Sequence, residues 1–184
     1  MMIEDGTGTG RKAKVTLENQ LETLAIMMPL IRHINIVHAK VWTIPLDALA
    51  PSGATWFALV MNGGCSTYTF NRIVLTSSVA GLFRIAKVTG TPSGGTAISP
   101  VNLNLGSSNL PDLLTIQSGT SITGLTEAGH IAPCYCPAGQ PVNIETQPGI
   151  ILPPGLTGLA LKAPAAATVY GFIEFVADDL DALG

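Results

Sequence analysis

The chain has 184 residues, a formal net charge of -3 and only 11% charged residues, where about 25% is typical of soluble domains. Its length predicts one domain with a core that needs no disulfide bonds. The 47% of hydrophobic residues excludes an intrinsically disordered chain. The negative balance and the 5% of aromatic residues exclude a general nucleic-acid binder and a base-stacking surface.

The low charge has two interpretations. A free monomer ordinarily keeps a charged surface because charge maintains its solubility. This chain therefore either hides much of its surface in an assembly or presents a neutral surface of Ser, Thr, Asn and Gly. Composition alone leaves both interpretations open.

No targeting signal is expected from the sequence. The start, Met1–Gly6, has neither the basic region nor the apolar region of a secretory signal. The most apolar stretch, Leu24–Trp42, contains proline, charged residues and histidines, so it does not read as a membrane span. The three cysteines are Cys65, Cys134 and Cys136, and their odd number and Cys-x-Cys spacing favour folding in a reducing cytosol.

The first 28 residues are expected to form an extended, flexible arm. The run Gly6-Thr7-Gly8-Thr9-Gly10 is too rich in glycine to hold one conformation, and residues 14–17 and 21–28 are expected to be short extended pieces. Such an arm can become ordered against a neighbouring subunit. At the other end, the acidic tail of residues 179–184 is expected to fray.

Between these ends, residues 29–178 carry the short apolar or alternating runs typical of strands. Strands are expected at residues 31–44, 55–61, 65–75, 82–88, 113–116, 121–125, 130–135, 142–145, 150–152, 156–162 and 168–176. A brief pairing is expected at 101–105, with Asn102 and Asn104 facing outward. Loops are expected at 45–53 and 89–99, and Asn62-Gly63-Gly64 is a hairpin signal.

These elements predict an all-β protein. No segment has the long period of 3.6 residues that a βαβ unit needs, and turn signals recur every few residues, as in a sandwich or barrel. We expect a single β-sandwich domain over residues 29–178. A jelly roll is preferred to an immunoglobulin-like sandwich, because the Cys…Trp…Cys spacing is absent. The order of the strands is left open.

One group of residues has the chemistry of metal ligands. His130, Cys134 and Cys136 could ligate zinc, but Cys-x-Cys is shorter than the usual spacing and no second ligand pair lies nearby. Two cysteines at this spacing share one face of a strand, so buried structural thiols are preferred; metal binding is left open. His33 and His38 would point to opposite faces of a strand, which argues against a metal pair.

No catalytic, cofactor-binding or metal-binding residue is predicted, and no enzymatic activity is expected. The Gly-x-Ser-x-Gly elbow is absent, and spacing cannot test a carboxylate pair of Asp112 and Glu127. The glycine run of the arm lacks the ending of a phosphate loop. Trp42 and Trp56 are expected in the core or an interface rather than in a sugar-binding platform.

Several segments together carry a resemblance to a known group. They are Ile3-Glu4-Asp5-Gly6-Thr7-Gly8-Thr9-Gly10, Ala13-Lys14-Val15, Glu18-Asn19-Gln20-Leu21, Ala80-Gly81-Leu82-Phe83-Arg84, Gly90–Thr96, Pro100–Ser107 and Ile151-Leu152-Pro153-Pro154-Gly155. In these segments the chain resembles small β-sandwich virion structural proteins of tailed bacteriophages. It departs from fibre proteins in size, since it has no distal receptor-binding domain and no long fibre repeat.

The resemblance implies a viral structural protein located in the virion, which is assembled in the host cytoplasm. The preferred function is that of a capsid decoration (cement) protein that binds the bacteriophage head and stabilises it. Its expected partners are the major capsid protein or other virion proteins and its own copies in a homotrimer, which fits three-fold lattice positions. No nucleic acid, membrane or cofactor is expected as a partner, and a small-molecule ligand is not expected.

The alternatives are a neck or tail adhesion module that binds a host surface glycan, and a small cytosolic enzyme on a jelly roll. In the preferred interpretation the arm reaches a neighbour and pairs as an added strand. The expected capsid or inter-subunit contacts are Gly6, Gly8, Gly10, Lys14, Val15, Leu17, Leu21 and Leu24.

Overall fold

The computed structural model describes residues 2–4, 12–15, 21–22 and 34–178. The chain forms two compact units, residues 1–30 and 31–184. The first contains a small antiparallel sheet in the order β1-β2-β3. Its strands are β1 (Met2–Glu4), β2 (Lys12–Val15) and β3 (Leu21–Glu22).

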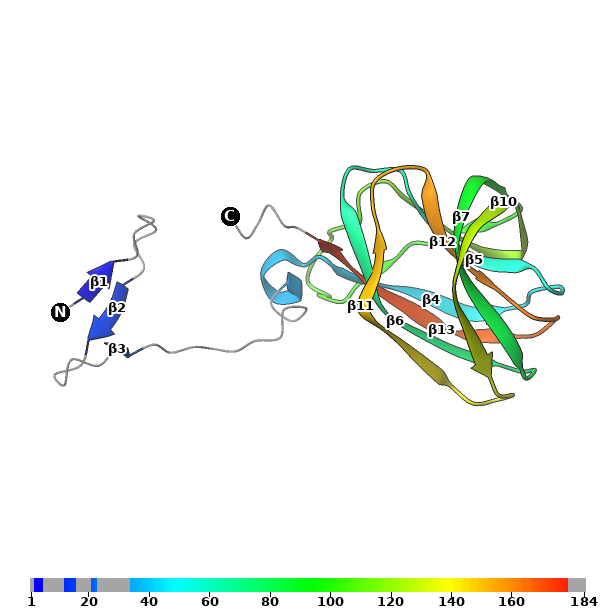
Figure 1. Ribbon diagram of the computed structural model, residues 1–184. Coiled ribbons are helices and arrows are strands. Elements are labelled where there is room, and N and C mark those ends of the chain that lie inside the picture. Colours follow the sequence, from blue (N-terminus) through cyan, green and yellow to red (C-terminus); the bar gives the residue numbers. More distant parts are fainter. Residues whose placement is uncertain (1, 5–11, 16–20, 23–33, 179–184) are drawn as a thin grey trace. The chain divides into compact units, whose positions relative to one another are not determined.

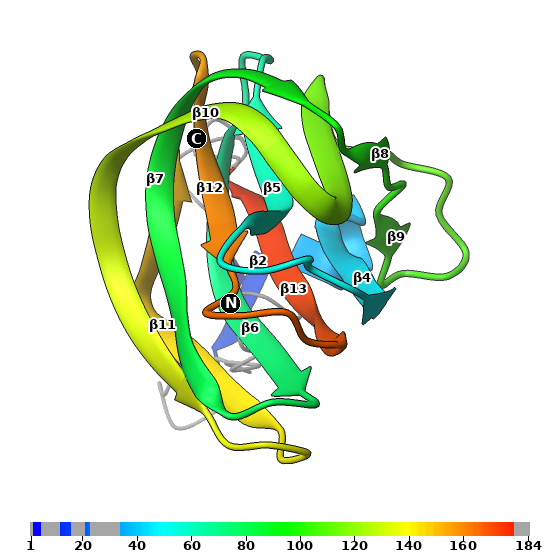
Figure 2. The same ribbon diagram turned by 90° about the vertical axis from the view of Figure 1, so that its right-hand side faces the viewer.

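The second unit consists of two five-stranded antiparallel sheets (Figures 1 and 2). The first sheet has the order β11 (Val142–Leu152), β6 (Thr67–Ser77), β13 (Val169–Asp178), β4 (Val41–Leu49) and β9 (Val101–Asn102). The second sheet has the order β5 (Trp56–Asn62), β12 (Thr157–Lys162), β7 (Gly81–Ser93), β10 (Leu114–Cys136) and β8 (Thr96–Ala97).

The strand order is that of a jelly roll. Each sheet has four long strands, and the chain changes sheet at every step between long strands except from β7 to β10. The resulting orders, β4-β13-β6-β11 and β5-β12-β7-β10, are those of two interlocked Greek keys. The prediction of an all-β sandwich with jelly-roll topology is confirmed.

The main core lies between the two sheets. Inward positions alternate along the strands, as Phe83 and Ile85 do in β7, and both are fully buried. Phe175 in β13 stacks on Trp42 at 5.5 Å between ring centroids and meets Tyr68 edge to face at 5.8 Å. These large aromatic side chains hold the sheets together, since each buries much apolar area.

β10 curls the second sheet back on itself. Its first part pairs with β5, from Leu114 to Ile122, and its second part pairs with β7, from Thr123 to Cys136. Figure 2 shows the strand arching over the end of the sheet. A second, smaller core forms on the outer side of this sheet; it consists of Trp56, Leu59, Met61, Ala86, Val88, Ile122 and Ala160. For this reason every residue of β5 is buried.

Two predictions at the start of the second unit are wrong in part. Of the strand expected at 31–44, residues 41–44 are strand as the start of β4, Ile34–His38 form a single π-helical turn instead, and residues 31–33 lie outside the described residues. The loop expected at 45–53 is strand as far as Leu49. Pro45 pairs with Phe172 of β13, while β9 covers the other edge of β4 only at Trp42 and Thr43. The missing N–H of a proline is tolerated at such an open edge.

Several predicted breaks are also wrong. Asn62-Gly63-Gly64 is not a hairpin turn, because β5 and β6 lie in different sheets and the turn carries the chain between them. The expected loop at 89–99 contains the end of β7 and all of β8. The three strands expected between 113 and 135 form one strand, β10, and those at 142–145 and 150–152 form β11; bulges in the pairing absorb the irregularities.

Candidate functional site

The loop after β9 presents large apolar side chains to solvent. We call residues 103–113 the leucine loop. Leu105 is 87% exposed, and Leu110 and Leu113 are each 70% exposed. Leu103 and the neighbouring Val101 are also exposed. Exposed apolar side chains gathered on one segment mark an interaction surface more often than scattered ones do.

In this segment the polar side chain points inward and the apolar side chains point to solvent, which is the reverse of an ordinary surface strand. The sequence predicts Asn102 facing outward, and this is wrong: Asn102 is buried. Its Nδ2 donates to the carbonyl oxygens of Ala39 at 2.7 Å and Asn109 at 3.2 Å, and its Oδ1 accepts from the Asn104 N–H at 2.8 Å. Because the amide is satisfied inside, the adjacent leucine faces solvent.

Further hydrogen bonds fix the leucine loop on the π-helical turn and on β4. Asn104 Nδ2 donates to the Asn35 carbonyl at 3.2 Å, and Asn109 Nδ2 donates to the His38 carbonyl at 3.3 Å. Trp42 Nε1 donates to the Asn109 carbonyl at 3.0 Å. Ile36 of the same turn is 55% exposed. The exposed side chains are therefore held in place by a braced backbone rather than by packing of their own.

The segment that contains the loop has no charge. From residue 88 to residue 111 the sequence contains no Asp, Glu, Lys or Arg. Asp112 closes the loop: its carbonyl accepts from the Tyr68 hydroxyl at 3.1 Å, and burial raises the pKa of Tyr68. An uncharged apolar surface can be covered by a partner without desolvating an ion.

Patterns in the sequence alone do not reveal this surface. Its available signal was the uncharged stretch of residues 88–111 together with Val101-Asn102-Leu103-Asn104-Leu105. Alternation alone assigns the leucines of such a run to the core. The Ala39 carbonyl, which accepts from the buried Asn102 amide, lies 63 residues earlier in the chain.

The predicted contact residues of the arm are only partly described. Lys14 and Val15 lie in β2 and Leu21 lies in β3, where Val15 pairs with Leu21. The small sheet thus brings these three together. The other predicted contacts lie outside the described residues; they are Gly6, Gly8, Gly10, Leu17 and Leu24. The acidic tail, residues 179–184, also lies outside them.

The two cysteines of β10 have the surroundings of buried structural thiols. Cys134 and Cys136 face the main core and are both buried, as predicted, whereas His130 is exposed. Burial raises the pKa of both thiols, which keeps them protonated near neutral pH. In the part of the chain that the structure describes, no group of three or more His, Cys, Asp or Glu side chains could hold a metal ion. His38 lies in the π-helical turn rather than a strand, and His33 is outside the described residues.

The remaining candidates take structural positions. Trp42 belongs to the main core and Trp56 to the smaller one, as expected. Glu127 forms an ion pair with Arg84 at 3.2 Å, while Asp112 accepts a bond from the Cys65 N–H at 3.5 Å. The two carboxylates thus serve separate contacts.

No family model, curated protein or solved structure matches the chain. No helix in the described parts of the chain is long and apolar enough to cross a membrane.

Proposed function

We propose that the protein is a structural component of a bacteriophage virion, a decoration protein that binds the assembled head and stabilises it. The observation that carries the proposal is the leucine loop, whose apolar side chains are held facing solvent by a network of asparagine amides. A surface built in this way is suited to be covered by another protein.

Three further properties support the same function. The jelly roll is an architecture that viral capsid domains use, although it also occurs in lectins and cupins, so this support rests on analogy. The charge content of 11% fits a chain whose surface is largely covered in an assembly. The resemblance to virion proteins of tailed bacteriophages points to the same class.

In this proposal the partners are the major capsid protein and further copies of this chain in a trimer, and the protein has no enzymatic role. Binding by many copies sums modest contacts into a stable coat. The first 28 residues add a second contact by pairing with a neighbour. The leucine loop supplies the apolar contact, because covering a large apolar side chain contributes roughly 1.5–3 kcal/mol.

The test is co-sedimentation with phage heads that lack this protein. The Leu105→Lys/Leu110→Lys variant should lose most of its head binding while its melting temperature stays close to that of the wild type. The matched control is Leu156→Lys, which changes a leucine that is 79% exposed in the turn after β11. This control should bind heads like the wild type.

A second arm of the experiment removes residues 1–23. We expect this variant to stay folded and to lose head binding. Binding by hundreds of copies supports decoration, whereas a few copies per particle together with glycan affinity would support the adhesion module. Heads that bind the leucine-loop variant as tightly as the wild type would refute the role of the loop.

A further inference from the structure

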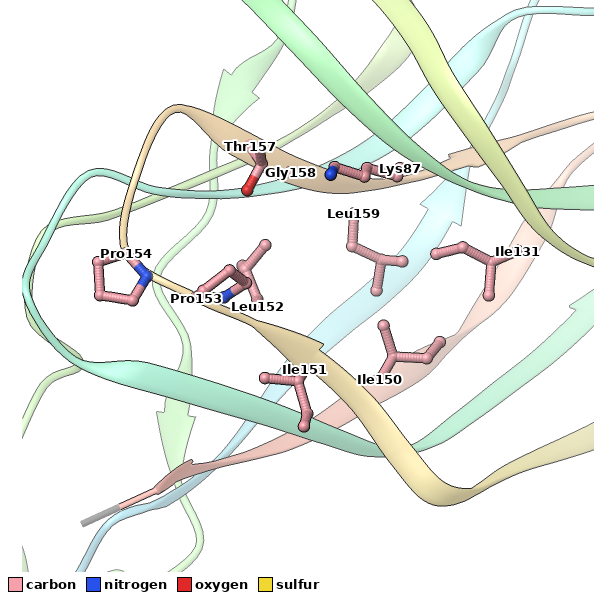
Figure 3. Close-up of a pocket in the computed structure, with 10 residues that line it drawn as sticks. All are labelled: Lys87, Ile131, Ile150, Ile151, Leu152, Pro153, Pro154, Thr157, Gly158 and Leu159. Carbon is pink, nitrogen blue, oxygen red and sulfur yellow. The ribbon is translucent and has the colours of Figure 1, made fainter. Parts of the chain in front are cut away.

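A groove opens between the two sheets along one side of the sandwich. It has a volume of about 480 Å³. Four strands contribute to it, and Figure 3 shows Ile131 of β10, Ile150 of β11 and Leu159 of β12 converging on its centre. Most of the lining is aliphatic or proline side chain. The size falls within the range of small-molecule sites, roughly 300–1,000 Å³.

One lysine stands among these apolar side chains. Phe83, Ile85 and Lys87 lie on the same face of β7; the first two are buried in the main core, whereas Lys87 is exposed to solvent where the two sheets part. Lys87 lies opposite Leu159 of β12 and lines the groove. It is the single charged residue in the lining, and among the described side chains none forms an ion pair with it.

A role in protecting a sheet edge does not explain this position. Inward lysines do protect exposed edge strands against pairing with other chains. β7, however, is paired with β12 on one side and with β10 on the other. Lys87 therefore lies on an interior strand, at the point where the two sheets part.

The groove also offers a polar group beside the lysine. In Figure 3 the Thr157 hydroxyl and the Lys87 ammonium lie along the same rim, with the aliphatic side chains of Leu159 and Ile150 below them. An apolar groove with one cation and one hydroxyl at its rim matches a ligand with an aliphatic chain and an anionic end. A carboxylate at that rim would form a charge-assisted hydrogen bond with the ammonium group.

We propose that this groove binds an amphipathic carboxylate, with its aliphatic chain on Ile131, Ile150 and Leu159 and its carboxylate at Lys87. The site goes beyond the proposed structural function and does not depend on it. It also departs from the sequence-based expectation that no small molecule binds. That expectation had no access to a groove whose residues come from four separate strands.

The experiment is a titration of the full chain with decanoate, followed by methyl NMR. Decanol and decyltrimethylammonium are the matched probes, since they keep the chain length and change the charge of the head group. All three are used below the concentration at which they form micelles. We expect decanoate to shift the methyl signals of Ile131, Ile150 and Leu159 saturably, decanol to bind more weakly, and decyltrimethylammonium to bind weakest.

The charge is tested by Lys87→Gln. This variant should bind decanoate about two- to fivefold more weakly, the range expected for losing one exposed charged partner, and should bind decanol like the wild type. The control is Lys162→Gln, which changes a lysine of the same sheet whose Nζ lies over the Trp56 ring at 5.3 Å, outside the groove lining. It should bind decanoate unchanged, and melting temperatures verify that each variant is folded.

Four outcomes of the probe titrations would overturn the proposal. They are no saturable decanoate binding, equal affinity for decanol and decanoate, equal decanoate affinity of Lys87→Gln and the wild type, and shifts spread over the whole protein instead of the groove. Groove signals that shift with protein concentration in the absence of probe would assign the groove to a second copy of the chain and would likewise overturn it.

Discussion

At the scale of single residues, burial of the Asn102 amide determines which side chains of its segment face solvent, and these are the apolar ones. A buried amide is stable only when its donors and acceptor are all engaged. Asn102 meets this condition through the carbonyls of Ala39 and Asn109 and the N–H of Asn104. The side chain thereby ties β9 to the start of β4 and to the far end of the leucine loop.

Asn102→Ala is expected to lower the free energy of unfolding by about 1–3 kcal/mol, because it leaves buried backbone groups without partners. Urea denaturation measures the change. The control is Asn143→Ala, which removes an exposed asparagine that bonds Arg72 and Glu145 at the surface. It should cost within about 0.5 kcal/mol. Equal effects of the two substitutions would contradict the bracing role of Asn102.

The same residue marks where prediction from sequence ends. In β7 the alternation of Phe83 and Ile85 correctly predicts their inward direction, because nothing competes with apolar burial there. At Asn102 the pattern predicts the wrong face. The hydrogen-bond partner Ala39 becomes a neighbour only after the fold has formed, so no local signal could place this residue or reveal the exposed loop.

At the scale of elements, β10 shows how one strand can serve two neighbours. The sequence suggests three strands here, at residues 113–116, 121–125 and 130–135, with Gly119 between the first two. In the fold the strand bends instead: Gly124 has φ of +75° and faces Gly90 of β7, whose φ is +113°. A Cβ at Gly124 would lie 2.2 Å from the Thr91 carbonyl oxygen. Glycine is therefore required at this crossing, whereas a Cβ at Gly129 of the same strand would meet no atom within 4 Å.

Gly124→Ala is therefore expected to destabilise the protein by about 2 kcal/mol or more, because it combines backbone strain with a clash. Gly129→Ala in the same strand is the matched control: a Cβ there meets no atom within 4 Å, and the change should stay within about 0.5 kcal/mol. Thermal or urea unfolding measures both. Similar stabilities of the two variants would show that the bend tolerates a side chain.

At the scale of the whole molecule, the turns connect the sheets rather than adjacent strands. Between residues 34 and 178, no two strands that follow one another in the chain pair with each other. Local turn chemistry finds the corners but cannot say which strands meet across them. This is why strand positions could be predicted approximately from sequence and the strand order could not.

This topology predicts slow folding. Pairing of distant strands must overcome loop-closure entropy before any contact compensates for it, so the main refolding phase should take milliseconds to seconds. Stopped-flow fluorescence of the buried Trp42 and Trp56 measures it. Refolding that is complete within about a millisecond would contradict the prediction.

The first and last strands of the sandwich lie side by side. β4 and β13 are antiparallel neighbours, Val41 pairs with Val176, and the Ala177 N–H donates to the Lys40 carbonyl at 3.1 Å. The chain thus begins and leaves the sandwich at the same corner. Tension applied between these two ends would load one hydrogen bond at a time and unzip the pair, starting at Lys40. If both ends were instead pulled together against the opposite end of the sandwich, the hydrogen bonds along two whole strands would share the load. The direction of the load therefore determines how much force the sandwich withstands.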